Sequence, residues 1–114
     1  MIKKIEKPWG YELILAHTNS YVMKKMLINP GQRMSLQYHE KKEETIYVHS
    51  SGPLMLWTSN DDSDFKILHR GESVHIKPGD VHRFGATEND SCILIECSTT
   101  ELDDVVRLRD DYER

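Results

Sequence analysis

The feature that most restricts the fold of this chain is a series of short strand-like runs with no helical period among them. The runs are rich in β-branched, aromatic or alternating apolar residues, as is typical of half-buried strands. They span residues 11–15, 21–28, 45–48, 54–57, 65–68, 73–76 and 92–95. Turn-forming residues separate them at fairly even spacing. We therefore expect an all-β protein made of antiparallel hairpins.

Strands this short leave many edges, and exposed strand edges invite pairing with other chains. For a chain of 114 residues, the economical way to hide these edges is a closed barrel or a two-sheet jelly roll. A chain of this length forms one domain, so we expect residues 1–114 to be a single domain. The carboxy-terminal stretch, residues 101–114, mixes both charge signs, and we expect a short helix or strand packed across the barrel.

Charge and hydropathy exclude several classes of partner. The chain has 15 Lys+Arg against 19 Asp+Glu and a formal charge of −4, whereas nucleic-acid binding depends on clustered cations. The basic amino terminus lacks the apolar segment of a signal peptide, and apolar runs such as 54–57 are too short to span a bilayer. We predict a cytoplasmic protein with no nucleic-acid partner and no membrane partner.

The two cysteines carry no predicted chemistry. Cys92 and Cys97 lie in one strand-like run, five positions apart, so they would point to opposite faces of a sheet. That separation is too large for a disulfide. We expect two reduced cysteines.

A candidate metal site emerges from two separated motifs. Gln37 and His39 are two positions apart, so on a strand they share a face. If residues 40–43 form a hairpin loop, Glu44 faces His39 across it. The turn Pro78-Gly79-Asp80 then delivers His82 at the start of the next strand.

Each of these residues has an ordinary alternative, since a single His on a strand is usually a surface or hydrogen-bonded residue. The combined spacing favours a site in which Gln37, His39, Glu44 and His82 bind a divalent metal ion. Imidazole and carboxylate ligands suit zinc, manganese, iron, nickel or cobalt, and the sequence does not choose among these metals.

These motifs resemble those of the cupin superfamily. The segment Ser35-Leu36-Gln37-Tyr38-His39 is similar to the cupin domain of type II mannose-6-phosphate isomerases, in which Gln replaces the first His of the usual pair. Further likeness lies in segments 7–11, 81–84, 103–107 and 110–114. The resemblance implies a single cupin barrel, a jelly-roll type of double-stranded β-helix, with a short carboxy-terminal extension. It also implies a divalent metal and a homodimer.

The resemblance implies an aldose–ketose isomerase that interconverts mannose 6-phosphate and fructose 6-phosphate, with a small-molecule sugar phosphate as partner. A general base is then required, and the sequence leaves Glu43, Glu96 and a histidine open. Cations for the phosphate are also left open. If His82 points inward, strand alternation sends Arg83 outward. The candidate cations are Arg33, Lys42, Arg83, Arg107 and Arg109.

Two other classes of function compete with the isomerase. The family motif usually has further His residues and an Arg after its metal His, and another His after the Glu. This chain instead has Glu40, Lys41, Lys42 and Thr45 at those positions. The differences favour a non-catalytic metal cupin that binds a sugar or another ligand. A metal-dependent dioxygenase is the third class, because it uses the same barrel with an open, redox-active metal.

Overall fold

The computed structural model describes residues 2–113 of the chain, in which strands are the only regular elements. The strands are β1 (Lys3–Lys7), β2 (Gly10–His17), β3 (Val22–Ile28), β4 (Leu36–Tyr38), β5 (Glu44–Ser51), β6 (Leu54–Trp57), β7 (Phe65–Leu68), β8 (Ser73–Ile76), β9 (Arg83–Ala86), β10 (Cys92–Ser98) and β11 (Val106–Arg109). Within residues 2–113, no helix is long and apolar enough to cross a membrane.

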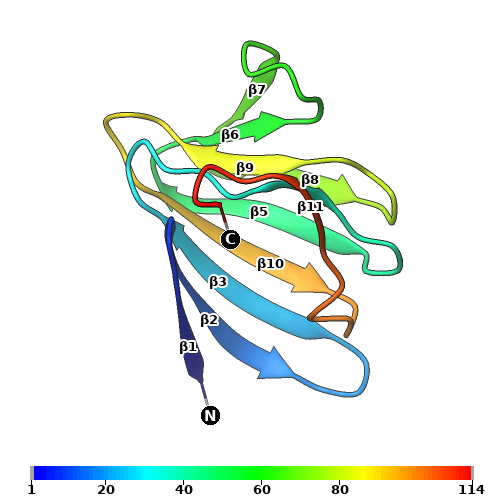
Figure 1. Ribbon diagram of the computed structural model, residues 1–114. Coiled ribbons are helices and arrows are strands. Elements are labelled where there is room, and N and C mark those ends of the chain that lie inside the picture. Colours follow the sequence, from blue (N-terminus) through cyan, green and yellow to red (C-terminus); the bar gives the residue numbers. More distant parts are fainter. Residues whose placement is uncertain (1, 114) are drawn as a thin grey trace.

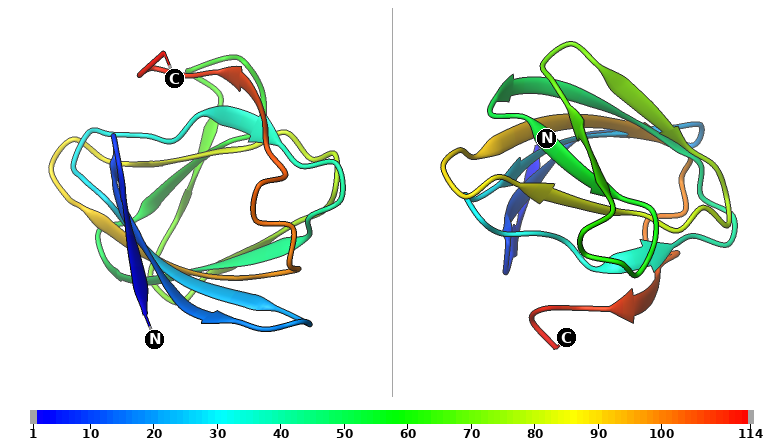
Figure 2. Two further views of the ribbon diagram at one scale, coloured as in Figure 1. Left: turned by 60° about the horizontal axis from the view of Figure 1, so that its bottom comes forward. Right: turned by 90° about the horizontal axis from the view of Figure 1, so that it is seen from above.

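The strands form three antiparallel sheets that wrap around a common interior (Figures 1 and 2). The large sheet has the order β1-β2-β3-β10-β5-β8, and the smaller sheets are β7-β6-β9 and β11-β4. Isolated bridges from Arg33 to Gly85 and from Gln37 to His82 join the segments between the sheets. The all-β expectation is therefore confirmed.

Alternation along the strands decides which side chains face the interior. In β3 the burial alternates at every residue, so Val22, Lys24, Met26 and Ile28 are buried while their neighbours are half exposed. β5 and β10 alternate in the same way. The interior is an apolar core at one end, with Trp9, Ile46, Leu54, Phe84 and Leu94 among its members. Toward the other end its buried residues include charged side chains.

Several expected strands are present, and one strand in the structure, β1, was not predicted. The runs 65–68 and 73–76 match β7 and β8 to the residue. β1 was missed because its sequence, Lys-Lys-Ile-Glu-Lys, is charged, as suits an edge strand. The strand expected at Gln37 is β4, and the strand expected to begin at His82 is β9, which begins one residue later. The carboxy-terminal stretch was expected to form a short helix or a strand. It forms a strand, β11, which pairs with β4.

The expected hairpin over residues 40–43 is not a hairpin. β4 pairs with β11, whereas β5 pairs with β10 and β8, so the connection between β4 and β5 passes from one sheet to another. His39 and Glu44 are thus close because the chain crosses from one sheet to the next between them. The cysteine prediction is confirmed, since Cys92 is buried, Cys97 is exposed and both are free.

Arg83 is the clearest departure from simple alternation. It was expected to point outward, but all four residues of β9 are buried and Arg83 is only 1% exposed. The segment around Met34 and the carboxy-terminal residues cover that face. Arg83 Nε donates to the Met34 carbonyl at 2.7 Å, and its Nη2 donates to Asp111 Oδ1 at 3.1 Å. The carboxy-terminal segment, residues 99–111, therefore buries a side chain that would otherwise face solvent.

A set of ion pairs fastens this segment to the barrel. Asp111 accepts two further hydrogen bonds from Arg33, at 2.6 and 3.0 Å. Arg109 makes a bidentate pair with Asp62, at 2.9 and 2.8 Å, which ties β11 to the loop between β6 and β7. In both views of Figure 2, β11 lies beside β4, with which it pairs.

Candidate metal centre

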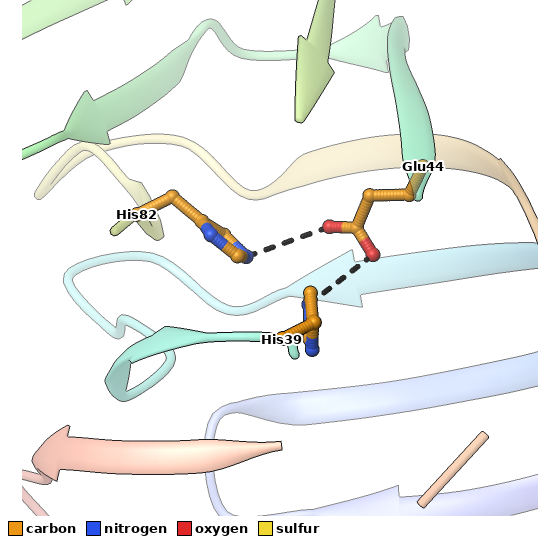
Figure 3. Close-up of side chains that lie close together, drawn as sticks. All are labelled: His39, Glu44 and His82. Atoms are coloured by element: carbon orange, nitrogen blue, oxygen red, sulfur yellow. Dashed lines mark ion pairs between the residues drawn. The ribbon is translucent and has the colours of Figure 1, made fainter. Parts of the chain in front are cut away.

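Three segments of the chain bring two imidazoles and one carboxylate together inside the barrel. His39 follows β4, Glu44 is the first residue of β5, and His82 directly precedes β9. Glu44 Oε2 lies 3.5 Å from His39 Nε2, and Glu44 Oε1 lies 3.5 Å from His82 Nε2 (Figure 3). One ligand atom from each residue falls within 4.8 Å of the others. The predicted convergence of these three residues is therefore present.

Backbone carbonyls fix the orientation of both imidazole rings. His39 Nδ1 lies 2.5 Å from the carbonyl oxygen of Asp104, and His82 Nδ1 lies 2.8 Å from that of Asp80. A carbonyl oxygen only accepts, so each Nδ1 carries a proton, and in the neutral ring each Nε2 lone pair points toward Glu44. This outer contact, Nδ1–H to a carbonyl, is the usual support of a metal-binding histidine.

The inward nitrogen atoms of this trio lack hydrogen-bond partners. His39, Glu44 and His82 are 3%, 3% and 0% exposed, and neither Nε2 atom makes a hydrogen bond in the described chain. Buried polar atoms are almost always satisfied, so two unsatisfied nitrogens facing one carboxylate need an explanation. A divalent cation supplies it, because imidazole nitrogen and carboxylate oxygen are suitable ligands. The donor set therefore fits a metal ion.

Gln37, the fourth predicted ligand, lines the same cavity as His39 and Glu44. Its side-chain oxygen accepts a hydrogen bond from the Ser35 hydroxyl at 2.8 Å. Its backbone exchanges two hydrogen bonds with His82, at 3.0 and 2.9 Å, and so holds one imidazole-bearing segment beside the other. A role of Gln37 as a metal ligand stays a prediction.

Lys42 extends the trio into a buried charge network. Its Nζ lies 3.0 Å from Glu44 Oε2 and 3.1 Å from Glu96 Oε2. Burial opposes the charge on Lys42, but the two carboxylates prevail and raise its pKa. For Glu96, burial and the nearby Glu44 raise the pKa despite the ammonium. Glu44 is thus the carboxylate of the pair that ionises more readily.

The two histidines differ in protonation. Burial lowers the pKa of His82, which favours the neutral ring that a metal ion needs. Burial also disfavours charge on His39, but contact with Glu44 and the Asp104 carbonyl outweighs it and raises the pKa. In the metal-free protein His39 therefore holds its extra proton more firmly, and a bound metal ion would displace that proton.

His39 and Glu44 line a cavity of about 100 Å³. Its wall comes from strands of the large sheet and from the carboxy-terminal segment, including Glu12, Lys24, Leu102 and Arg107. Lys24 and Glu12 form a buried ion pair at 3.3 Å. A neighbouring hollow of about 530 Å³ shares Glu12, Lys24, Leu102 and Lys7 with it.

The other predicted site residues are divided between this cavity and the surface. Glu96 and Lys42 line the cavity, whereas Glu43 is exposed and contacts His75 at 2.5 Å. Of the candidate phosphate cations, Arg107 lines the cavity as well. The remaining candidates belong to the ion pairs of the carboxy-terminal segment: Arg33, Arg83 and Arg109.

Two residues that take part in the candidate site, Lys24 and Asp104, were not predicted from the sequence. Lys24 sits on the inward face of β3 between Val22 and Met26, and a lysine in an otherwise apolar alternating face is a signal of a buried charge. Asp104 carried no such signal, because its contacts join positions more than sixty residues apart.

The pKa of Glu44 predicts how acid affects the metal-free protein. Burial raises this pKa, but His39, Lys42 and His82 overcome that effect and lower it from 4.5 to about 2. In the unfolded chain the carboxylate takes up a proton near its ordinary pKa, so its contribution is present above about pH 4.5 and is lost as the pH falls toward 2. Between about pH 4.5 and about pH 2.5 we expect a loss on the order of 2 kcal/mol in the free energy of unfolding.

Urea unfolding of the metal-free protein at about pH 4.5 and about pH 2.5 measures this loss. In Glu44→Gln the loss over this interval should shrink, because the titrating carboxylate is gone. The matched control is Glu43→Gln, which removes the exposed neighbouring carboxylate and should leave the loss unchanged. Equal acid sensitivity in wild type and Glu44→Gln would contradict the assignment.

Solved structures with similar folds are cupins and double-stranded β-helix proteins. A cupin-2 domain from Rhodospirillum rubrum superposes with a TM-score of 0.79 at 12% identity, covering 93% of this chain and 74% of that one. The polyketide cyclase RemF from Streptomyces resistomycificus gives 0.78 at 19% identity, covering 94% and 80%. A cupin-like protein from Thermotoga maritima gives 0.74 at 21% identity, covering 91% and 80%. The expected cupin fold is confirmed.

Curated relatives resemble the chain over nearly its whole length. A mannose-1-phosphate guanylyltransferase from Escherichia coli K12 is 31% identical over 119 residues, covering 98% of this chain and 23% of the relative. The mannose-1-phosphate guanylyltransferase ManC from Salmonella typhimurium is 30% identical, covering 100% and 24%. This chain therefore spans about a quarter of the length of these relatives.

These relatives correct the functional expectation. The prediction that the chain interconverts mannose 6-phosphate and fructose 6-phosphate is wrong, because the relatives are guanylyltransferases of sugar-nucleotide synthesis that share only the cupin-like domain with it. The resemblance itself is confirmed. Residues 1–110 match the family described as the mannose-6-phosphate isomerase C-terminal domain, and the chain belongs to this family of cupins.

Proposed function

We propose that this chain is a metal-dependent binding domain for a small sugar phosphate. A divalent ion held by His39, Glu44 and His82 would contact sugar oxygens, and cations of the cavity wall would contact the phosphate. The observation that carries the proposal is the buried trio, in which two unsatisfied imidazole nitrogens face one carboxylate. A divalent ion supplies a Lewis-acidic centre that binds hydroxyl or carbonyl oxygens.

The charge of the cavity supports an anionic ligand. Lys42 and Lys24 are paired with buried carboxylates. Lys7 and Arg107 also line the cavity, and neither has an ion pair within residues 2–113. Lys7 is half-buried on β1 and Arg107 is exposed on β11, so their charges come from opposite walls. Cations without carboxylate partners are available for phosphate oxygens.

The size of the hollow supports a ligand as large as a sugar phosphate. The cavity at the trio alone measures about 100 Å³, but the hollow of about 530 Å³ continues from it past Lys7 and Leu102. Together they reach the size that small-molecule sites usually have. The names of the relatives point to mannose 1-phosphate as the first ligand to test.

A homodimer is part of the proposal, because the large sheet has an apolar outer face. Leu27 pairs with Ile93, and Ile95 lies between Lys25 and Tyr47 in the register of the sheet. These side chains are half-buried, and Tyr47 is 42% exposed. Two such faces can cover each other in an isologous interface, for which about 800 Å² per partner is typical.

We expect the protein to bind about one divalent ion per chain. His39→Ala and His82→Ala each remove one of three ligands, so each should weaken binding by more than the roughly 10–100-fold that losing an outer contact costs. Elemental analysis and metal titration measure this, and His75→Ala, an exposed histidine on β8, is the control. Gln37→Ala tests the fourth ligand. Wild-type affinity in both His39→Ala and His82→Ala would show that the site is wrong.

Calorimetry with the metal-loaded protein tests the ligand. We expect saturable binding of mannose 1-phosphate or mannose 6-phosphate and much weaker binding of mannose. Lys7→Ala and Arg107→Ala should each reduce affinity for the phosphorylated sugar about tenfold, because each removes a charge-assisted hydrogen bond. The control is Lys66→Ala, which lies on β7 in another sheet. Equal affinity for mannose and its phosphates would rule out a phosphate subsite.

Light scattering tests the dimer. We expect a mass of about twice 13.3 kDa, and we expect Ile95→Glu to give a monomer because it places a charge at the centre of the apolar face. Lys66→Glu changes an exposed position on β7 and should leave the mass unchanged. A wild-type mass near 13.3 kDa at high concentration would exclude the dimer.

A further inference from the structure

We propose that Asp104, which lies outside the ligand set, is the positioning residue of the metal centre. The inference rests on the proposed metal site. In it the carboxy-terminal segment, residues 99–111, holds His39 and the turn that follows it in the arrangement that the metal requires. The site is therefore completed by a segment far along the chain from its first motif.

The carboxylate of Asp104 organises the backbone of the turn that follows His39. Its Oδ1 accepts from the backbone N–H of Glu40 at 3.1 Å, and its Oδ2 accepts from those of Lys41 and Lys42 at 2.7 and 2.9 Å. Three successive N–H groups thus converge on one side chain. These donors lower the pKa of Asp104, so the carboxylate is ionised and keeps all its acceptor sites.

The main chain of Asp104 acts on the imidazole itself. Its carbonyl oxygen lies 2.5 Å from His39 Nδ1, which fixes the ring so that Nε2 faces Glu44. The carboxylate and the carbonyl belong to one residue, so they hold the ring and the turn in a fixed relation. The turn ends at Lys42, whose ammonium bridges Glu44 and Glu96. Asp104 thereby positions His39. It also positions Lys42, the cation beside Glu44.

The segment that carries Asp104 is held on both sides. Upstream, the Thr99 hydroxyl accepts from the Glu43 backbone N–H at 3.0 Å, and the Thr99 N–H donates to the Glu43 carbonyl at 3.0 Å. Downstream, β11 pairs with β4, and Asp111 accepts from Arg33 and Arg83. Asp104 therefore has little freedom to move, as positioning requires.

The decisive comparison is Asp104→Asn against Asp103→Asn. The two variants change the net charge equally, but Asp103 is exposed and its side chain makes no hydrogen bond among the described residues. The Asp104→Asn variant keeps the backbone carbonyl and loses at least one of the three acceptor contacts. Co²⁺ is the probe, because its visible spectrum reports ligand geometry. We expect Asp104→Asn to bind Co²⁺ about 10–100-fold more weakly with a changed spectrum, and Asp103→Asn to match wild type.

A second readout needs no metal. In the metal-free wild type, nitrogen-15 NMR should show His39 with its neutral ring protonated at Nδ1, and Asp104→Asn should show a mixture of both tautomers. If Asp104→Asn does not fold, Asp104→Ser, which keeps one acceptor for the turn, is measured against the same criteria.

The outcomes separate this inference from the proposed function. A folded variant with lower thermal stability but wild-type Co²⁺ affinity, spectrum and His39 tautomer would overturn the positioning role. If wild type itself binds no Co²⁺ and no other divalent ion, the proposed metal site fails. The tautomer comparison then still decides whether Asp104 orients His39.

Discussion

A carboxylate buried inside a small barrel is the constraint on which the rest of this structure depends. Glu44 is 3% exposed, and an ionised carboxylate in such a place is costly unless cations or donors surround it. Lys42 supplies one positive charge, and His39 and His82 supply two nitrogen atoms at 3.5 Å. Lys42 in turn is buried, so it requires Glu96 as a second counter-charge. The polar end of the interior is therefore one interdependent set, and a metal ion would join it as the cation that faces the unsatisfied nitrogens.

The sequence predicted that His39, Glu44 and His82 lie close together, but it did not predict the strand pairing that brings them there. His39, Glu44 and His82 were correctly brought together, because a Pro-Gly turn and motif spacing restrict where a short strand can begin. The supposed hairpin between His39 and Glu44 is instead a corner between sheets, which depends on β4 pairing with β11. Arg83 shows the same limit. Alternation assigns faces relative to one sheet, and it fails where a distant segment, here the carboxy-terminal residues, covers the outer face.

The family places the chain among cupins without deciding its chemistry, since one fold serves many functions. A barrel with two imidazoles and a carboxylate accommodates binding as readily as catalysis. What distinguishes the two is the presence of a correctly placed proton-transfer group, and Glu96 is engaged with Lys42 while Glu43 lies outside. The arrangement of charges around the trio therefore bears on function more directly than the fold does.

The order of strands in the large sheet has a consequence for how the chain acquires its structure. β10 lies between β3 and β5, so Leu94 pairs with Met26 on one side and with Val48 on the other. The strand at the middle of the sheet is thus supplied by residues 92–98, long after its two neighbours. During synthesis β3 and β5 each keep one edge unpaired until the residues of β10 have left the ribosome. Pairings this distant in sequence slow folding, and they expose strand edges during the delay. Glu44 on β5 and His82 before β9 are therefore set in place only after translation of the domain is nearly complete.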